Sequence, residues 1–564
     1  ERLVSKNKTW WDEVKANFTG LGFETQFVDR FGGWERLAQA MDPLKGRQMM
    51  YYFRMYDQRQ NFVSQAIQRG ALKIVEKTRK DGQIERLIEA SDGASIRGVV
   101  NILKQAEGVV GNSVAVNRLF TMYMSAIRAD NKGFETLHFG KELTKTGLDR
   151  ARAQVENNPL VYKIFEAARK EYNAYNRGMI DFLLSAKVID ESTHTKLLAE
   201  DDYIPWYRQR GGVIDLVIGN ETPIRIGDVT NQPHLDKLVG GDEAILDFLT
   251  SSVQNTGMLA DMGMRNLSSK NAVYEMVELG LAKIGKGRGT GTNVIHFTDI
   301  NKDGQLADLH AVLMTDKVGL DPDILIKGME GIPTQLSGIM KLMAFPATVL
   351  RKTVTLSPLY MAKQLFRDSF AASIASGANT IPVMSALKEI RIGSGKTKDI
   401  LERRGVVGGQ MFTGGTDEIT NVLNRMLADK KVSWQGAIGA LEAMNMEADA
   451  ATRRSQYNSY IKQGMSEMEA TLMSLESMNF NKRGASPSVH WLNSMIPFFN
   501  AQVQSLNVLY KSITGKMPHN EKLKIQQKLF IRGAMLAASS IMYAALMQDD
   551  EAVSYTHLTL PTIL

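Results

Sequence analysis

The segment from Asp299 to His310 has the residue types of a calcium-binding loop. Asp299, Asn301 and Asp303 stand at positions 1, 3 and 5 of such a loop, and Gly304 stands at position 6. This spacing places oxygen ligands around a sharp turn, as Ca²⁺ requires. Position 12, where a bidentate Glu would close the shell, is His310. The preceding residues favour a strand rather than a helix, so we predict a hairpin turn without metal.

Two glycine-rich basic segments partly resemble phosphate-binding loops. In Gly393–Thr397 the order is Gly-Ser-Gly-Lys-Thr, but Ile390 replaces the first glycine of the motif and a helical pattern precedes it. The motif requires a preceding strand, so we expect a solvated basic loop there. The second segment, Gly285–Gly291, lacks the Gly-x-Gly-x-x-Gly spacing and opens no helix. We expect it to be a flexible linker between a helix and a strand.

The composition excludes several classes of catalytic site. The chain of 564 residues has no cysteine, which excludes disulfides, thiol nucleophiles and thiolate metal sites. Its eight histidines never show His-x-x-x-His or His-Glu-x-x-His spacing, so a zinc site is not predicted. The 61 acidic residues include no recognisable glycosidase or muralytic pair, and no Gly-x-Ser-x-Gly elbow is present. We therefore expect no catalytic, cofactor-binding or metal-binding residue in this chain, and no cofactor.

A basic segment near the end of the chain is more informative. Residues 480–532 carry eight Lys or Arg and one acid, Glu521, so their net charge of +7 equals the formal charge of the whole chain. Such a segment can contact nucleic acid or anionic lipid, although a solvated helix face has the same composition. The candidate contacts with phosphate, DNA or lipid are Lys511, Lys516, Lys522, Lys524, Lys528 and Arg532.

An uncharged segment, Gly533–Gln548, follows the basic one. Its sixteen residues are too few for a bilayer-spanning helix, which needs roughly 20. Gly533, Ala537, Ser540 and Ala544 recur at helical spacing and would allow close helix packing. We expect a buried helix, with an interfacial or membrane-inserting helix as the alternative.

Apolar residues at intervals of three and four predict helices on both sides of residues 203–330. The clearest stripe runs from Leu160 to Leu183, and Asn158-Pro159 marks a helix start. Within 203–330, β-branched runs bounded by Gly and Asn predict β-hairpins, with a helix near residues 243–267. The expected fold class is mainly α, elongated or multi-domain, with strands confined to this small mixed α/β insert.

Both ends of the chain indicate a fragment of a longer reading frame. The sequence begins at Glu1 without an initiator Met, and no signal peptide is evident near it. The codons of Val553–Thr562 can spell a transposase adapter used in library sequencing. We therefore treat residues 553–564 as an artefact of metagenomic sequencing rather than as a natural β-like tail.

The remaining sequence divides into five expected parts. They are an N-terminal helical region (1–158), a helical pair (159–202), the mixed insert (203–330), a helical module (331–480) and a basic, then apolar, helical segment (481–552).

Several motifs stand between residues 160 and 548. They are Asp202-Tyr-Ile-Pro-Trp-Tyr-Arg208, Thr355-Leu-Ser-Pro-Leu-Tyr-Met-Ala-Lys-Gln-Leu-Phe-Arg-Asp368, Gly464-Met-Ser-Glu-Met-Glu-Ala470 with Asn479-Phe-Asn-Lys-Arg-Gly484, and Ile496-Pro-Phe-Phe-Asn-Ala501 with Gln504. In combination they resemble the large polyvalent proteins of tailed bacteriophages, and more narrowly their helical associated module, which is also found in internal virion proteins. Ser357, Gln364 and Asn479 depart from the Asn, Asn and Asp of that family.

The resemblance implies a non-catalytic structural and transport module of a virion protein that enters the host with phage DNA. It implies other virion proteins as partners, with DNA and, through residues 533–548, a membrane as further candidates, in an oligomer or larger assembly. The family-like structural residues are Pro358, Arg367, Asp368, Pro497, Phe498 and Asn500. The alternatives are a nucleic-acid-binding module through residues 480–532, or the non-catalytic part of a polyprotein with enzyme domains elsewhere.

Overall fold

The computed structural model describes residues 24–133, 136–138, 142–199, 202–203, 225–226, 230, 247–318, 320–330, 332–333, 395–407, 450–476, 482–486, 489 and 503–504. The chain forms two compact units. Unit 1 comprises residues 1–16, 34–334 and 400–432, and unit 2 comprises residues 17–33, 335–399 and 433–564.

Helices dominate the described residues, which confirms the predicted mainly α class. The helices with residues in unit 1 are α3 (Gly32–Ala40), α4 (Pro43–Asp57), α5 (Arg59–Arg69), α6 (Ile96–Leu103), α7 (Glu107–Val110), α8 (Ser113–Lys132), α9 (Lys145–Glu156), α10 (Pro159–Ser185), α11 (Glu191–Ala199), α12 (Phe248–Glu278), α13 (Pro322–Met329) and α17 (Lys396–Arg403), with short 3₁₀ turns η2 (Lys104–Ala106) and η3 (Thr315–Val318). The helix predicted near residues 243–267 is α12, which starts later and ends later than predicted.

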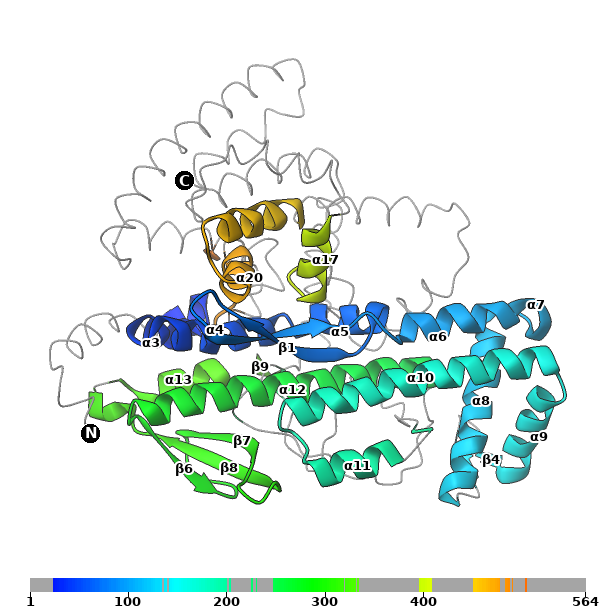
Figure 1. Cartoon of the computed structure of the whole chain (residues 1–564). Helices are drawn as coiled ribbons and strands as arrows, with labels where there is room; N and C mark the ends of the chain where they lie inside the picture. Colours follow the sequence, from blue (N-terminus) through cyan, green and yellow to red (C-terminus); the bar gives the residue numbers. More distant parts are fainter. Residues whose placement is uncertain are drawn as a thin grey trace, which may run out of the picture. The chain divides into compact units, whose positions relative to one another are not determined.

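Helix α10 begins and packs as its sequence predicts. The side chain of Asn158 accepts a hydrogen bond from the N–H of Val161 at 3.2 Å, and Pro159 is the first helical residue. The predicted stripe is buried at Val161, Ile164, Phe165, Ala168, Tyr172, Tyr175, Met179, Phe182 and Leu183. Leu160 is the exception, because it is 53% exposed. In Figure 1, α10 lies alongside α12, the other long helix of unit 1.

An aromatic cluster joins α8, α10 and α12. Phe120 of α8 meets Phe165 of α10 and Phe248 of α12 edge to face, with ring centroids 5.1 and 5.0 Å apart. Tyr172 of α10 meets Phe248 at 4.6 Å. All four rings are buried. Each such pair contributes about 0.5–1.5 kcal/mol beyond the burial of area, so the cluster fixes the three helices relative to one another.

Helix α12 is buried on most of its circumference although it is rich in Ser, Thr and Asn. The hydroxyls of Ser252 and Thr256 donate to the carbonyl oxygens four residues earlier, so the helix itself satisfies them. The amide of Asn266 donates to the carbonyl oxygens of Ala186 and Thr298 at 2.9 Å each, and its oxygen accepts from the N–H of Thr298 at 2.8 Å. These bonds tie α12 to the end of α10 and to a strand of the insert.

Strands occur both inside and outside the predicted insert. They are β1 (Leu72–Thr78), β2 (Ile84–Ala90), β3 (Thr136–His138), β4 (Glu142–Thr144), β5 (Arg225–Ile226), β6 (Ala282–Lys286), β7 (Val294–Ile300), β8 (Leu306–Leu313) and β9 (Ile332–Pro333). The prediction that strands are confined to residues 203–330 is wrong, because β1–β2 and β3–β4 are antiparallel hairpins that precede the insert.

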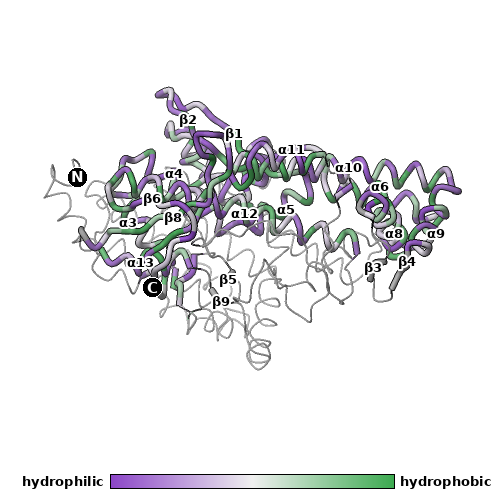
Figure 2. The backbone as a smooth tube through the Cα atoms, turned by 90° about the horizontal axis from the view of Figure 1, so that it is seen from below, coloured by the Kyte–Doolittle hydropathy of each residue, from purple (hydrophilic) through white to green (hydrophobic). Residues whose placement is uncertain are grey.

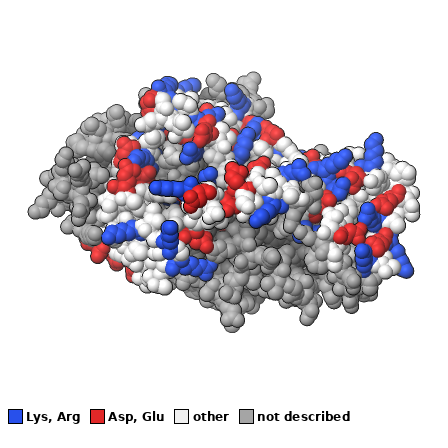
Figure 3. All heavy atoms as spheres, turned by 60° about the horizontal axis from the view of Figure 1, so that its bottom comes forward, with Lys and Arg blue, Asp and Glu red and all other residues white. Residues whose placement is uncertain are grey.

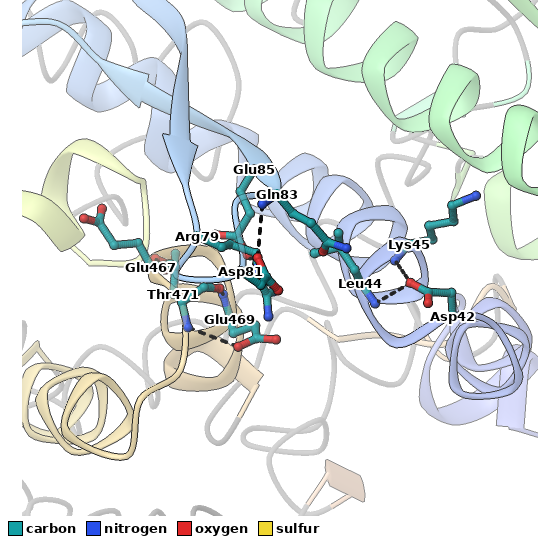
Figure 4. Close-up of polar contacts among 11 residues, drawn as sticks. Asp42, Leu44, Lys45, Arg79, Asp81, Gln83, Glu85, Glu467, Glu469 and Thr471 are labelled. Carbon is teal, nitrogen blue, oxygen red and sulfur yellow. Dashed lines mark hydrogen bonds and ion pairs between the residues drawn. The ribbon is translucent and has the colours of Figure 1, made fainter.

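The β1–β2 hairpin closes through a polar turn. The carboxylate of Asp81 accepts a hydrogen bond from the N–H of Gln83 at 3.1 Å, and Arg79 pairs with Glu85 at 3.0 Å (Figure 4). Figure 2 shows hydrophilic residues at the tip of this hairpin. At its base the N–H of Ile88 donates to the hydroxyl of Tyr51 of α4 at 3.0 Å. The base of the hairpin is therefore anchored to the helical core, while its tip is polar.

A three-stranded sheet with the order β6-β8-β7 lies below α12 in Figure 1. Both outer strands are antiparallel to β8, so β6 and β7 run parallel to each other. The connecting residues 287–293 must therefore cross over β8 and run back along it from the row of Leu309 to the row of Val312. The register places Gly285, His310 and His296 in one row across the three strands.

The described part of unit 2 contains a π-helical turn, η1 (Glu24–Val28), helical residues 450–462 and helix α20 (Glu467–Glu476). The N–H of Arg30 donates to the carbonyl oxygen of Arg483 at 2.8 Å. The N–H of Ala485 donates to the carbonyl oxygen of Thr25, also at 2.8 Å. Segments from opposite ends of the chain therefore pair within this unit.

Candidate functional site

Most of the residues predicted to form sites lie outside the described residues. They are Lys511, Lys516, Lys522, Lys524, Lys528 and Arg532 of the basic segment, residues 533–548, and Pro358, Arg367, Asp368, Pro497, Phe498 and Asn500 of the family-like motifs. The motif residues that the structure describes include Asp202, Ser466, Glu469, Lys482 and Gln504. Their contacts are the most direct information on what the motifs do.

Asp202 accepts hydrogen bonds from polar side chains of α10. Its carboxylate accepts hydrogen bonds from Arg169 at 3.0 Å and from Asn173 at 2.9 Å. The other nitrogen of the Arg169 guanidinium donates to Glu166 at 3.0 Å, so one cation bridges two carboxylates. The hydroxyl of Tyr123 of α8 donates to the same Glu166 at 2.6 Å. We call these five residues the Asp202 cluster.

The electrostatics of the Asp202 cluster favour a fixed clamp. Burial, and then the hydrogen bond to Glu166, raise the pKa of Tyr123 well above its usual range, so its phenol stays protonated and donates. Each carboxylate is held by the Arg169 guanidinium, and charge-assisted bonds of this kind are short and directional. Next to Asp202, Tyr203 lies under the guanidinium of Arg128 of α8 at 4.7 Å. The cluster thus joins α8, α10 and the start of the Asp202–Arg208 motif.

The Gly464–Ala470 motif forms the turn between two helices and the start of the second. Gly464 has φ +88°, a left-handed conformation that favours glycine, and it ends the helical residues 450–462. The hydroxyl of Ser466 accepts from the N–H of Glu469 at 3.2 Å, and the carboxylate of Glu469 (Figure 4) accepts from the N–H of Ser466 at 3.1 Å. These reciprocal bonds form a capping box at the start of α20. The Ser-x-x-Glu spacing could have identified this role from the sequence.

Gln504 and Lys482 connect distant segments of unit 2. The side-chain amide of Gln504 donates to the carbonyl oxygens of Val28 at 2.8 Å and Lys482 at 3.1 Å. The ammonium of Lys482 pairs with Glu476 of α20 and lies 3.7 Å from the carboxylate of Asp29. Lys482 belongs to the basic segment that we considered for phosphate contact. Its charge is instead engaged by two carboxylates of its own unit.

The turn between β7 and β8 is the hairpin predicted for Asp299–His310. The side chain of Asn301 accepts from the N–H groups of Asp303 and Gln305 at 2.9 Å each, so it shapes the turn. Asp299 accepts from Lys270 and Tyr274 of α12, both at 2.5 Å. Burial would raise the pKa of Asp299, but these two bonds outweigh it and lower the pKa below its usual value. Asp299 therefore anchors the hairpin to α12.

The two glycine-rich segments differ from their predictions. Lys396 and Thr397 form the first turn of α17 rather than a solvated loop, and the hydroxyl of Thr397 donates to Asn458 at 2.9 Å. The segment Gly285–Gly291 is not a linker between a helix and a strand, because Gly285 already belongs to β6. Residues 287–291, which follow β6, cross over β8 towards β7.

Within the described residues, no group of three His, Asp or Glu side chains could hold a metal ion. No helix in the same part of the chain combines the length and apolar character needed to cross a membrane. Figure 3 shows acidic and basic side chains intermingled over the described part of the face in view. Comparisons with protein-family models, curated proteins and solved structures found no match to this chain.

Proposed function

We propose that the chain is a non-catalytic structural and transport module of a phage internal virion protein, which enters the host with phage DNA. One observation carries this proposal. The motif residues Asp202, Ser466, Glu469, Lys482 and Gln504 all act as caps or as ties between segments. Residues used in this way specify a fold, and a family resemblance built on them supports a shared architecture rather than a shared reaction.

The composition suits passage through a narrow tail. A protein ejected with DNA would unfold and then refold, and the absence of cysteine removes any cross-link that would oppose this. Helical folds with many local contacts refold within about microseconds to milliseconds. The 30 methionines provide adaptable side chains that tolerate repacking. We therefore expect residues 1–552 to refold rapidly and reversibly after dilution from denaturant, as stopped-flow fluorescence would measure. Refolding over minutes, or aggregation at low concentration, would contradict passage as an unfolded chain.

Location inside the virion is the direct test of the proposal. Phage particles from the source of the sequence would be purified, treated with protease and nuclease, and analysed by peptide mass spectrometry. We expect peptides of this chain to survive in intact particles and to disappear when particles are opened before digestion. Peptides found in infected cells but never in particles would refute a virion protein.

A second candidate, nucleic-acid binding through residues 480–532, is favoured by the net charge of +7 in that segment. Changing Lys522, Lys524 and Lys528 to Glu should weaken binding to all DNA sequences alike, because phosphate contacts carry no sequence information. The matched control changes Lys73, Lys80 and Lys104 of unit 1 to Glu. Unchanged binding in the first variant would leave the basic segment as a solvated face.

A third candidate places enzyme domains outside this chain. The assembled longer reading frame would test it, because transglycosylase, protease or helicase motifs beside residues 1–552 would make this chain the non-catalytic part of a polyprotein. An assembled frame without such motifs would remove this candidate.

A further inference from the structure

The two edges of the three-stranded sheet differ in how their backbone groups are used. The outer edge of β7 is covered. Asn266 of α12 accepts a hydrogen bond from the N–H of Thr298 at 2.8 Å and donates to the carbonyl oxygen of the same residue at 2.9 Å. The N–H of His296 donates to the carbonyl oxygen of Thr230 at 2.7 Å. The opposite edge of the sheet is β6, which pairs with β8 on its other side (Figure 1).

Two residues of β6 direct their backbone groups away from the sheet. Directly after β6, the N–H of Gly287 donates to the carbonyl oxygen of Asp308 at 2.8 Å, in register with the β6–β8 pairing. Because an antiparallel ladder uses every second residue of a strand, the odd-numbered residues of β6 bond to β8, and Ile284 and Lys286 face outward. Within the described part of the chain, their N–H groups and carbonyl oxygens have no partner. Such an edge can be extended by a further strand.

The apolar side of the sheet also ends at this edge. Ile284 stands in one row with Ala311 of β8 and Ile295 of β7, and side chains in one row lie on the same face. Ala311 and Ile295 are fully buried, whereas Ile284 is 38% exposed. An apolar side chain on a further strand would lie next to Ile284 and cover it.

The charges beside Ile284 indicate which kind of strand fits. Lys283 and Lys286 are both exposed, and because they are three residues apart they lie on opposite faces of β6. Neither forms an ion pair with any described residue, and the sequence has no acid between Glu278 and Asp299. A second copy of β6 would bring more lysines to an edge without acids, and lysine on an edge strand opposes such self-pairing. An acidic strand would instead place a carboxylate beside each lysine.

We propose that the open edge of β6 binds an extended acidic segment of a partner protein, which joins the sheet as a further strand. In an antiparallel pairing, this segment has an acid opposite Lys286 and another acid opposite Lys283, with an apolar residue opposite Ile284 between them. Read from its amino end, the pattern is acid-x-apolar-acid. The apolar residue exchanges two backbone hydrogen bonds with Ile284, so the main chain provides affinity and the side chains provide specificity. The proposal does not rest on the virion function or on residues 480–532.

The test measures binding of the full chain to a labelled peptide, Thr-Thr-Glu-Thr-Val-Glu-Thr-Thr, by fluorescence polarisation. A matched peptide carries an N-methyl group on Val, which removes the donor that faces Ile284 and leaves the charge unchanged. We expect the first peptide to bind and to slow hydrogen exchange of the Ile284 and Lys286 amides. The N-methyl peptide should bind about tenfold more weakly. Equal binding of both peptides, or no binding of the first, would overturn the proposal.

Variants of the chain locate the contact. Lys283→Glu/Lys286→Glu should weaken binding of the first peptide about tenfold, because repulsion replaces two exposed ion pairs. The control Lys73→Glu/Lys80→Glu makes the same charge change at exposed positions of the β1–β2 hairpin and should retain the affinity. Ile284→Pro removes an N–H that the β6–β8 ladder does not use, so the sheet should persist while binding is lost. An equal loss in both charge variants, or retained binding in a folded Ile284→Pro variant, would contradict strand pairing at β6.

Other occupants of this edge give different results. Sedimentation of the unmodified chain should show no self-association through β6. Self-association that Ile284→Pro abolishes would assign the edge to a second copy of the chain and overturn the acidic partner. A DNA duplex and vesicles of phosphatidylcholine and phosphatidylserine should not bind through this edge. If either bound, lost this binding in Lys283→Glu/Lys286→Glu, and the peptide did not bind, the two lysines would be phosphate contacts and the proposal would be wrong.

Discussion

Replacing Asp202 with Asn tests whether this buried motif residue has a structural role. The substitution preserves the size of the side chain and suits the backbone, because Asp202 has φ 67° and Asn adopts the left-handed region readily. The amide oxygen can still accept from Asn173. The change therefore isolates the negative charge that faces Arg169 at 3.0 Å.

The expected loss follows from the burial of the pair. The Asp202 side chain is 7% exposed and that of Arg169 is 27% exposed. Hydrogen bonds to charged groups contribute about 1.5–3 kcal/mol. Because Arg169 keeps its bond to Glu166, the loss should lie near the lower end, about 1–2 kcal/mol. Arg169→Gln removes the cation from two carboxylates, which keep Asn173 and Tyr123 as donors, and should approach about 3 kcal/mol, the lower end for breaking a buried pair.

Native-state hydrogen exchange of α10 peptides would measure these losses locally. Asp181→Asn is the matched control on the same helix, because its carboxylate is 62% exposed and should change stability by less than about 0.5 kcal/mol. Arg169→Gln should lose the most protection, Asp202→Asn should lose less, and Asp181→Asn should lose the least. Unchanged or increased protection in Asp202→Asn would refute the clamp and make Asp202 a new candidate for a functional role, because functional residues are often destabilising.

Four other outcomes are expected. Ser466→Ala should destabilise the first turn of α20 by about 1 kcal/mol, measured by exchange of α20 amides, since it removes the capping hydroxyl. Gly285→Ala should lower the melting temperature by displacing His310, and overpacking of this kind costs about 1–3 kcal/mol. The pKa values of Asp190 and Asp299 are lowered in the fold, the first mainly by hydrogen bonds from Thr193. Their stabilisation is thus present above about pH 3.9 and is lost as the pH falls below it, so acid titration by circular dichroism should detect it. A calcium titration should leave the melting temperature unchanged, because a ligand that bound the β7–β8 turn only in the native state would raise it.

The sequence predicted helix α10 well because its signals are local. An Asn cap, a Pro at the first position and a stripe at intervals of three and four specify one helix and one buried face within Asn158–Leu183. Leu160 departs from the stripe and is 53% exposed, because it lies about 100° around the helix from Val161, at the edge of the buried face. A periodic pattern predicts which face is buried, but it does not predict where a neighbouring element ends.

The β1–β2 hairpin was missed although its signals were also local. Residues 72–90 contain β-branched or Leu residues on both sides of Asp81-Gly82, which is a hairpin turn signal. Assigning residues 1–200 to helices by class overrode this turn signal, and the adjacent apolar and charged pairs of the two strands hide the two-residue period. The roles of Asp202, Lys482 and Gln504 were missed for a different reason. Their partners are 29 or more residues away for Asp202 and up to 476 residues away for Gln504, and no local pattern identifies such partners.

The segment Gly285–Gly291 combines a local sequence pattern with a contact to a residue distant in the sequence. Glycine at every second position, with Lys286, Arg288 and Thr290 between, is a strand-like alternation in which one face of an extended chain has no side chains. A face without side chains allows the backbone to lie directly against another surface. The alternation therefore indicates a packed segment rather than a flexible linker. The surface itself, the imidazole of His310, follows only from the register of β8. Once that surface is placed, Gly285 and Gly289 lie against the imidazole, whereas Lys286, the last residue of β6, stands on the other face of the sheet.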